Sequence, residues 1–199
     1  MILIEETTVP DLALPVSQFK SHLRQGTGFT EDSVQEAVLN GFLRAAIAAI
    51  EARTGKVLIE RAYSWELTAW RGTQGQVLPV APVSTLTQVT LVAADGAETD
   101  FDLARFRLEK DSQQPRLVPA GAALPTLAAG AAVRVRFTAG LAADWDGLPA
   151  DLGQAVLMLA AHYYEYRNET SLSDGCMPFG VTSLIQRYRN LRVSPGYVR

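Results

Sequence analysis

The chain is poor in the residues that most often carry chemistry. Its 199 residues include one cysteine, Cys176, and two histidines, His22 and His162. A single cysteine excludes an internal disulfide and any zinc site built from several cysteines, so the fold does not depend on an oxidising compartment. Each histidine falls on an expected helix with no second histidine at ligand spacing, and we interpret both as surface or boundary residues.

Strong charge and long apolar runs are also missing. The formal net charge is -3, which argues against a nucleic-acid-binding protein of the basic type. No apolar run approaches the roughly 20 residues that span a bilayer. The first residues lack the basic and apolar regions of a signal peptide, so we expect no membrane partner. The hydrophobic fraction of 48% is sufficient for a packed core.

The hydrophobic pattern divides the chain into helices at both ends and strands in the middle. Helices are expected within residues 15–54 and 149–192, because apolar residues recur there at helical spacing. Gly55 follows the first of these segments at a natural helix C-terminus. Between about 57 and 138 the period changes to two, which predicts a small antiparallel β-region. The order of helices, strands and helices indicates an α+β domain whose two ends meet to bury their apolar faces.

Two long helices carry the widest apolar stripes. We predict that the helices at 31–54 and 150–168 pack against each other. The residues expected at this contact are Val38, Phe42, Ile47, Val156, Leu159 and Tyr163.

Catalytic patterns are weak throughout. No Gly-x-Ser-x-Gly elbow is present, and Asp144 and Asp146 have no further acids to complete a metal site. The alternative function is a small cytoplasmic enzyme with a pocket near His162, Tyr163 and Tyr166. We favour a simpler interpretation, in which these rings pack at a helix edge with their polar tips in water.

Arginines follow the expected strands in two pairs. Arg105 and Arg107 alternate, as do Arg134 and Arg136, so each pair is expected on one face of a strand. One interpretation is a solvated sheet face. The other makes all four residues intersubunit contacts that meet acidic groups of a neighbouring subunit.

The C-terminus is locally basic. It contains Arg187, Arg189, Arg192 and Arg199, and no acid follows Asp174. In an otherwise acidic chain this asymmetry indicates an anionic partner surface. DNA binding by these arginines is a third interpretation, but the low net charge and the absence of a recognition-helix pattern argue against it.

Four stretches, taken in order, resemble the head-tail connector, or adaptor, family of long-tailed phages and phage-derived gene transfer agents. They are residues 19–24, residues 47–65, the segments 78–84, 89–96 and 133–140, and residues 149–169 with 178–189. Each motif alone is weak, whereas their order and spacing over nearly the whole chain are fairly specific. The lead of residues 1–14 is longer than the family pattern.

The resemblance implies a fold, an assembly and a location. It implies a mainly α-helical bundle with an inserted small antiparallel β-region, formed by residues 1–199 as a single connector domain. It also implies a non-enzymatic structural adaptor that forms a dodecameric ring between the portal protein and a tail-side connector or stopper protein. DNA would pass through the ring without specific binding. The adaptor would belong to the head-tail junction of a virion or phage-like particle that is assembled in the host cytoplasm. The family supplies no catalytic residue, cofactor or metal ligand.

The last helix and the tail at 193–199 are predicted to bind the portal. The segment is basic, and Pro195 and Gly196 cannot extend the helix. Such a tail is expected to order on binding. The residues predicted to contact the portal are Arg187, Arg189, Arg192, Tyr197 and Arg199.

Overall fold

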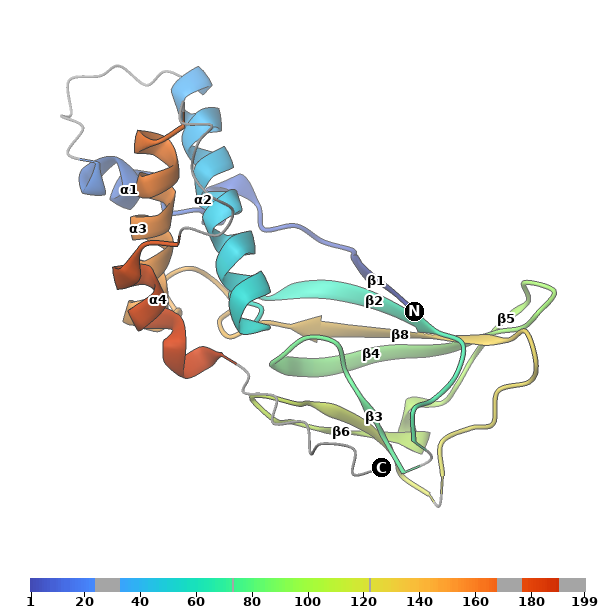
Figure 1. The fold of residues 1–199 in the computed structure, drawn as a ribbon. Helices are drawn as coiled ribbons and strands as arrows, with labels where there is room; N and C mark the ends of the chain where they lie inside the picture. The colour runs from blue at the N-terminus through green and yellow to red at the C-terminus, as the bar shows by residue number, and fades with distance from the viewer. Residues whose placement is uncertain (24–32, 73, 122, 168–176, 190–199) are drawn as a thin grey trace, which may run out of the picture. The chain divides into compact units, whose positions relative to one another are not determined.

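The chain folds as two compact units (Figure 1). The β unit is formed by residues 1–14 and 56–148, and the helical unit by residues 15–55 and 149–199. The computed structural model describes residues 1–23, 33–72, 74–121, 123–167 and 177–189.

The helical unit contains four α-helices in its described part. They are α1 (Val16–His22), α2 (Ser33–Thr54), α3 (Ala150–Glu165) and α4 (Phe179–Ile185), and the 3-10 turn η3 (Gln186–Tyr188) follows them. As predicted, Gly55 follows the C-terminus of α2; it has a φ of 69° and donates its N–H to the Glu51 carbonyl at 2.8 Å. The last helix begins at Phe179, because Pro178 occupies its N-cap.

The core of the helical unit forms where α2 packs on α3, as predicted. Ile47, Val156 and Leu159 are buried there, whereas Val38 is 47% exposed, so the prediction was wrong for Val38. The buried stripe of α2 passes through Leu39 instead, because one residue along a helix turns the side chain by about 100°. The other buried apolar residues of the unit are Phe19, Leu43, Ala46, Ile50, Leu152, Ala155, Ala160, Ala161, Val181 and Ile185.

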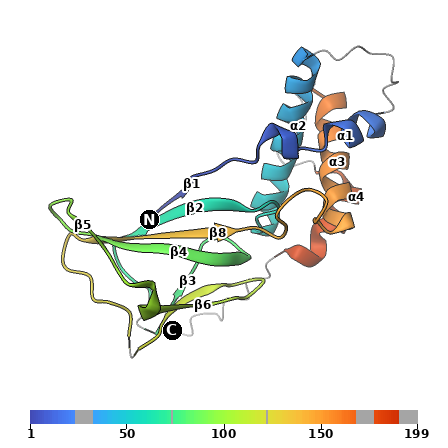
Figure 2. The ribbon, with the colours of Figure 1, turned by 180° about the vertical axis from the view of Figure 1, so that it is seen from behind.

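The β unit contains two antiparallel sheets in its described part (Figures 1 and 2). The five-stranded sheet has the order β1 (Ile2–Glu5), β2 (Arg61–Leu67), β8 (Ala132–Ala139), β4 (Val83–Val92) and β5 (Glu98–Asp100). The three-stranded sheet has the order β3 (Gln76–Val77), β7 (Arg116–Pro119) and β6 (Phe106–Glu109). Two 3-10 turns, η1 (Asp11–Ala13) and η2 (Leu103–Arg105), lie outside the sheets.

The two sheets enclose one hydrophobic core. Strand periodicity decides which side chains enter it, since successive residues point to opposite faces. Along β8, Val133, Val135 and Phe137 are fully buried. Trp65 of β2 and Leu117 of β7 join them in one cluster, so both sheets contribute to the core.

The middle segment of the β unit, residues 56–148, begins and ends at one place. The Leu141 N–H donates to the Val57 carbonyl at 3.0 Å, and the Glu60 N–H donates to the Ala142 carbonyl at 2.8 Å. A Cβ atom on Gly140 would lie 2.4 Å from the Glu60 Cα. Only glycine therefore permits the two segments to cross this closely.

The predicted fold class was wrong. In the part of the chain that the structure describes, eight strands in two antiparallel sheets accompany the four α-helices, so the fold is not mainly a helical bundle with a small β insertion. Residues 1–14 contribute a strand that the local pattern did not predict: Ile2 pairs with Glu66, and Glu5 pairs with Tyr63. Such a pairing joins positions more than fifty residues apart, and periodicity within a short window cannot detect it.

Candidate interaction surfaces

One face of the five-stranded sheet is a charged network around Arg134. This residue lies on β8, the central strand, between acids on both sides. Its guanidinium contacts Glu66 of β2 at 3.2 Å and Glu98 of β5 at 2.7 Å. The hydrogen bond to Glu98, helped by the one to Glu66, raises the pKa of Arg134 above its ordinary value.

Arg136 extends this network across the sheet. Its Nε contacts Glu6 at 2.9 Å and its Nη1 donates to the Gln88 amide oxygen at 2.6 Å. Asp100 accepts hydrogen bonds from Thr90 at 2.6 Å and from Gln88 at 2.8 Å. These bonds, that from Thr90 first, lower the pKa of Asp100. Arg134 and Arg136 thus share one strand face, as predicted, and their contact with another subunit stays a prediction.

Arg105 and Arg107 have different surroundings. Arg105 ends the turn η2, where its guanidinium lies 5.2 Å from the Phe101 ring centroid. Arg107 lies on β6, is largely exposed and pairs with Glu109 at 3.1 Å. Both arginines were predicted on one strand face, but the strand β6 starts at Phe106, so they do not share one. Their intersubunit role stays a prediction.

The basic C-terminal segment is attached to the start of α3. Arg187 Nε contacts Asp151 Oδ2 at 2.9 Å, and the Tyr188 hydroxyl donates to Asp151 Oδ1 at 2.8 Å. Arg187 also hydrogen-bonds the Tyr188 oxygen, and this bond raises the pKa of Arg187. Arg189 is exposed. Among the other residues predicted to bind the portal, Arg192, Tyr197 and Arg199 lie outside the described residues.

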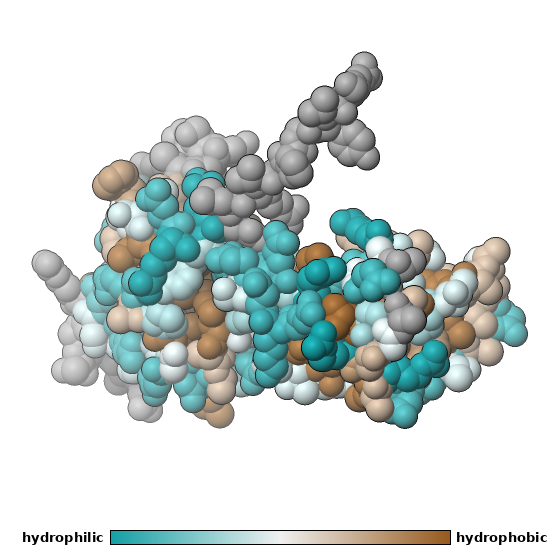
Figure 3. All heavy atoms as spheres, turned by 90° about the horizontal axis from the view of Figure 1, so that it is seen from below, coloured by the Kyte–Doolittle hydropathy of each residue, from teal (hydrophilic) through white to brown (hydrophobic). Residues whose placement is uncertain are grey.

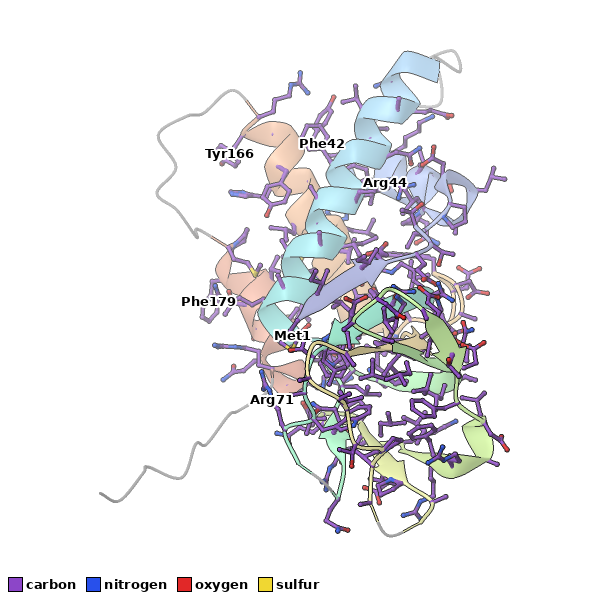
Figure 4. All side chains as sticks on the ribbon, turned by 90° about the vertical axis from the view of Figure 1, so that its right-hand side faces the viewer. Met1, Phe42, Arg44, Arg71, Tyr166 and Phe179 are labelled. Carbon is purple, nitrogen blue, oxygen red and sulfur yellow. The ribbon has the colours of Figure 1, made fainter. Side chains whose placement is uncertain are left out.

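The aromatic residues at the end of α3 line a helix edge. His162 and Tyr166 have ring centroids 4.7 Å apart, and Tyr166 is 43% exposed (Figure 4). Burial raises the pKa of Tyr163. This arrangement is typical of amphipathic rings at a surface, which is how the sequence was interpreted.

A further cluster joins the end of α3 to α2. The Tyr164 ring meets Phe42 edge-on, with centroids 5.7 Å apart, and Arg167 lies over Tyr164 at 4.7 Å. The two rings are half-buried and Arg167 is exposed. Aromatic and cationic clusters of this kind are a common feature of protein-binding surfaces.

The edge strand β1 is a surface that sequence reasoning missed. Met1, Ile2, Leu3 and Ile4 are between 40% and 71% exposed. On the face shown in Figure 3, by contrast, hydrophobic residues lie in small groups among hydrophilic ones. The apolar run at the start of the chain could have indicated this surface, but the local sequence pattern does not identify the strand with which the run pairs.

A shallow hollow adjoins the start of β1. It is lined by Met1, Trp65, Leu67, Thr68, Ala69, Arg71 and Gln76. Arg71 Nη2 lies 3.9 Å from the Met1 sulfur, and Figure 4 shows the two side chains next to each other. The Trp65 indole nitrogen is buried without an acceptor among the described residues.

The described residues offer no group of three or more metal-ligating side chains. Within that same part of the chain, no helix has the length and apolar character needed to cross a membrane.

Comparison with known proteins finds close relatives among solved structures. No family model and no curated protein matches the chain. A chain in the neck of an empty gene transfer agent particle, computed with C6 symmetry, is 50% identical with a TM-score of 0.89. A chain in the virion of a native gene transfer agent particle is 50% identical with a TM-score of 0.86. A chain in the neck of a native particle, computed with C12 symmetry, is 47% identical with a TM-score of 0.85. Each match covers 98% of this chain and 99% of the other.

Proposed function

The chain belongs to the head-tail connector, or adaptor, family of long-tailed phages and gene transfer agents, and from this membership we propose that its ring docks on the portal protein through the C-terminal segment. The chain is a structural component of the particle neck, at the head-tail junction. The observation that carries the adaptor role is identity of 47–50%, over nearly the full length, with chains from the neck and the virion of gene transfer agent particles.

The ring has a definite symmetry in this proposal. Neck structures computed with C6 and C12 symmetry indicate an oligomeric ring, and we assign twelve copies to it. Each copy then presents one side face to the preceding copy and a different side face to the next. Contacts between two different faces close into a ring when the rotation from one copy to the next permits it. One end of the ring meets the portal, and the other meets a tail-side connector or stopper protein.

DNA passes through the ring without specific binding in this proposal. A net charge of -3 in every copy sums to a negative field around a closed ring. A wall of this sign offers few cations to phosphate groups, so little affinity arises from the release of counterions. The subunit has no catalytic role, and the alternative pocket near His162 is a helix edge with an exposed Tyr166.

The attachment at Asp151 supports docking by the C-terminal segment. Asp151 holds both Arg187 and Tyr188 against the first turn of α3. This contact fixes the two residues with which the described segment nears its end. Arg187 keeps most of its side chain exposed, so it is available to an acidic partner while it pairs with Asp151.

Deletion of residues 193–199 tests the portal contact. We expect the truncated chain to fold with an unchanged melting temperature, while its binding to purified portal protein falls by about tenfold or more. Arg189→Glu should weaken the same binding because it reverses an exposed charge. The matched control is Lys110→Glu, which reverses an exposed charge in the β unit. Normal portal binding and a normal yield of tailed particles from the truncated chain would contradict the proposal.

A further inference from the structure

The two outer strands of the five-stranded sheet are both uncovered. β1 and β5 lie at opposite edges of the sheet, and every residue of both strands is exposed. An uncovered edge strand presents backbone N–H and C=O groups that pair readily with another strand, and proteins usually protect such an edge. The β1 edge is also apolar, with Ile2 and Ile4 more than half exposed.

The sheet topology gives these two strands the same direction. Every neighbouring pair in the order β1-β2-β8-β4-β5 is antiparallel. The first and fifth strands are therefore parallel to each other. A rotation about an axis that runs along the strands carries the β5 edge of one copy to the β1 edge of the next without reversing either strand.

The charges at the starts of the two strands are complementary. Arg71 lies beside Met1, at the start of β1, and has no carboxylate partner among the described residues. Asp95 lies in the turn just before β5, and its carboxylate accepts a hydrogen bond from the Ala97 N–H. Within the described part of the chain Asp95 has no cationic partner. Residues 93–102 contain four acids and no basic residue.

We propose that β1 of each subunit pairs in parallel with β5 of the neighbouring subunit, with Arg71 opposite the neighbour's acidic turn at Asp95. The occupant of the β1 edge is a second copy of this chain. The inference rests on the proposed ring, in which two different surfaces of one chain must meet at every contact. Pairing of this kind covers Ile2 and Ile4 and removes both free edges from every five-stranded sheet in the ring.

Charge exchange tests the pairing. Arg71→Glu or Asp95→Lys alone places like charges at the contact, and we expect either to lower the number of copies per purified particle by about tenfold. The double variant restores the attraction with its sign exchanged, so its copy number should return to within about twofold of the wild type. Lys110→Glu is the control and should leave the copy number unchanged. Single variants that assemble normally would overturn the proposed contact.

Cysteine crosslinking tests the strand pairing independently of charge. Leu3 and Thr99 share the inner face of the sheet, because Leu3 pairs with Trp65 and Thr99 with Leu91. Adjacent strands bring Cα atoms within the roughly 4.4–6.8 Å that a disulfide requires. Leu3→Cys with Thr99→Cys, in a Cys176→Ser background, should give a ladder of crosslinked multimers when particles are oxidised. Either substitution alone should give no ladder.

The outcomes separate this inference from the proposed function. A chain with both cysteine substitutions that enters particles at the normal level but stays monomeric after oxidation overturns the strand pairing and leaves the adaptor function intact. A crosslink from the Leu3→Cys variant to a different particle protein would assign the β1 edge to that protein, and it would also overturn the pairing. Failure of the wild-type chain to appear in necks would overturn both.

Discussion

Two regions of the β unit carry the same Arg-x-Arg pattern in different environments. Arg134 and Arg136 lie on β8, the central strand of five, and contact acids or amides on the strands around them. Arg105 lies just before β6, an edge strand of three, and Arg107 lies on it. There Arg107 pairs with Glu109 of its own strand. The same spacing therefore gives a continuous network in one sheet and local contacts in the other.

The difference teaches that neighbouring strands decide what a charged residue does. A central strand has partners on both sides, so a long arginine side chain there can contact several acids that are distant in sequence. Arg134 keeps only 23% of its side-chain surface exposed, whereas Arg107 keeps 69%. Ion pairs at largely exposed positions contribute little to stability.

The largest expected effect on stability comes from truncating core side chains next to the two Arg-x-Arg pairs. Phe137 of β8 is fully buried and stacks on Tyr63 with ring centroids 5.8 Å apart. Phe137→Ala should lower the free energy of unfolding by about 3–5 kcal/mol, because the cavity opens at the centre of the sheet. Phe106 lies on the edge strand β6 and contacts Phe101. Phe106→Ala should therefore lower the free energy of unfolding by less. Urea unfolding of both variants makes the comparison, and equal losses would contradict it.

Charge reversal should give the next largest effect. Arg134→Glu with Arg136→Glu places new acids beside Glu66, Glu98 and Glu6, so the fold itself should lose stability, by roughly 2–4 kcal/mol. The same exchange at Arg105 and Arg107 should change stability by about 1 kcal/mol or less. The second double variant is therefore the cleaner test of a subunit contact. Thermal unfolding measures the stability of both double variants. A loss of stability in the Arg105/Arg107 variant as large as in the Arg134/Arg136 variant would contradict the predicted difference.

The pH dependence of stability that comes from the charged network around Arg134 should be the smallest measurable effect. Hydrogen bonds from Thr90 and Gln88 lower the pKa of Asp100. The Asp100 carboxylate therefore stabilises the folded state above the ordinary aspartate range, and this contribution is lost as pH falls through the lowered pKa. Asp100→Asn lacks it at every pH. The difference in melting temperature between wild type and variant should be greatest near neutral pH and shrink in acid, and a constant difference would contradict the assignment.

Local patterns predicted the elements better than their partners. Alternation located the β-region in the middle of the chain. Gly55 marked the end of α2, because a residue with positive φ commonly follows a helix C-terminus. The predicted balance of the fold was wrong, partly because β1 is identified as a strand by β2 rather than by its own residues. The attachment of Arg187 to Asp151 joins positions 36 residues apart, and no spacing rule indicates it.

The crossing at Gly140 and Glu60 has a consequence for genetic exchange between related particles. Because the segment from 56 to 148 begins and ends at one place, recombination could transfer it as a cassette between two connectors without rerouting the chain. The cassette is incomplete, however, since β1 is encoded ahead of the first helix. A hybrid that inherits only the middle segment would pair its β2 with a foreign leading strand. Functional hybrids should therefore carry two exchanged segments, and the short leading one should match β2 of its own cassette.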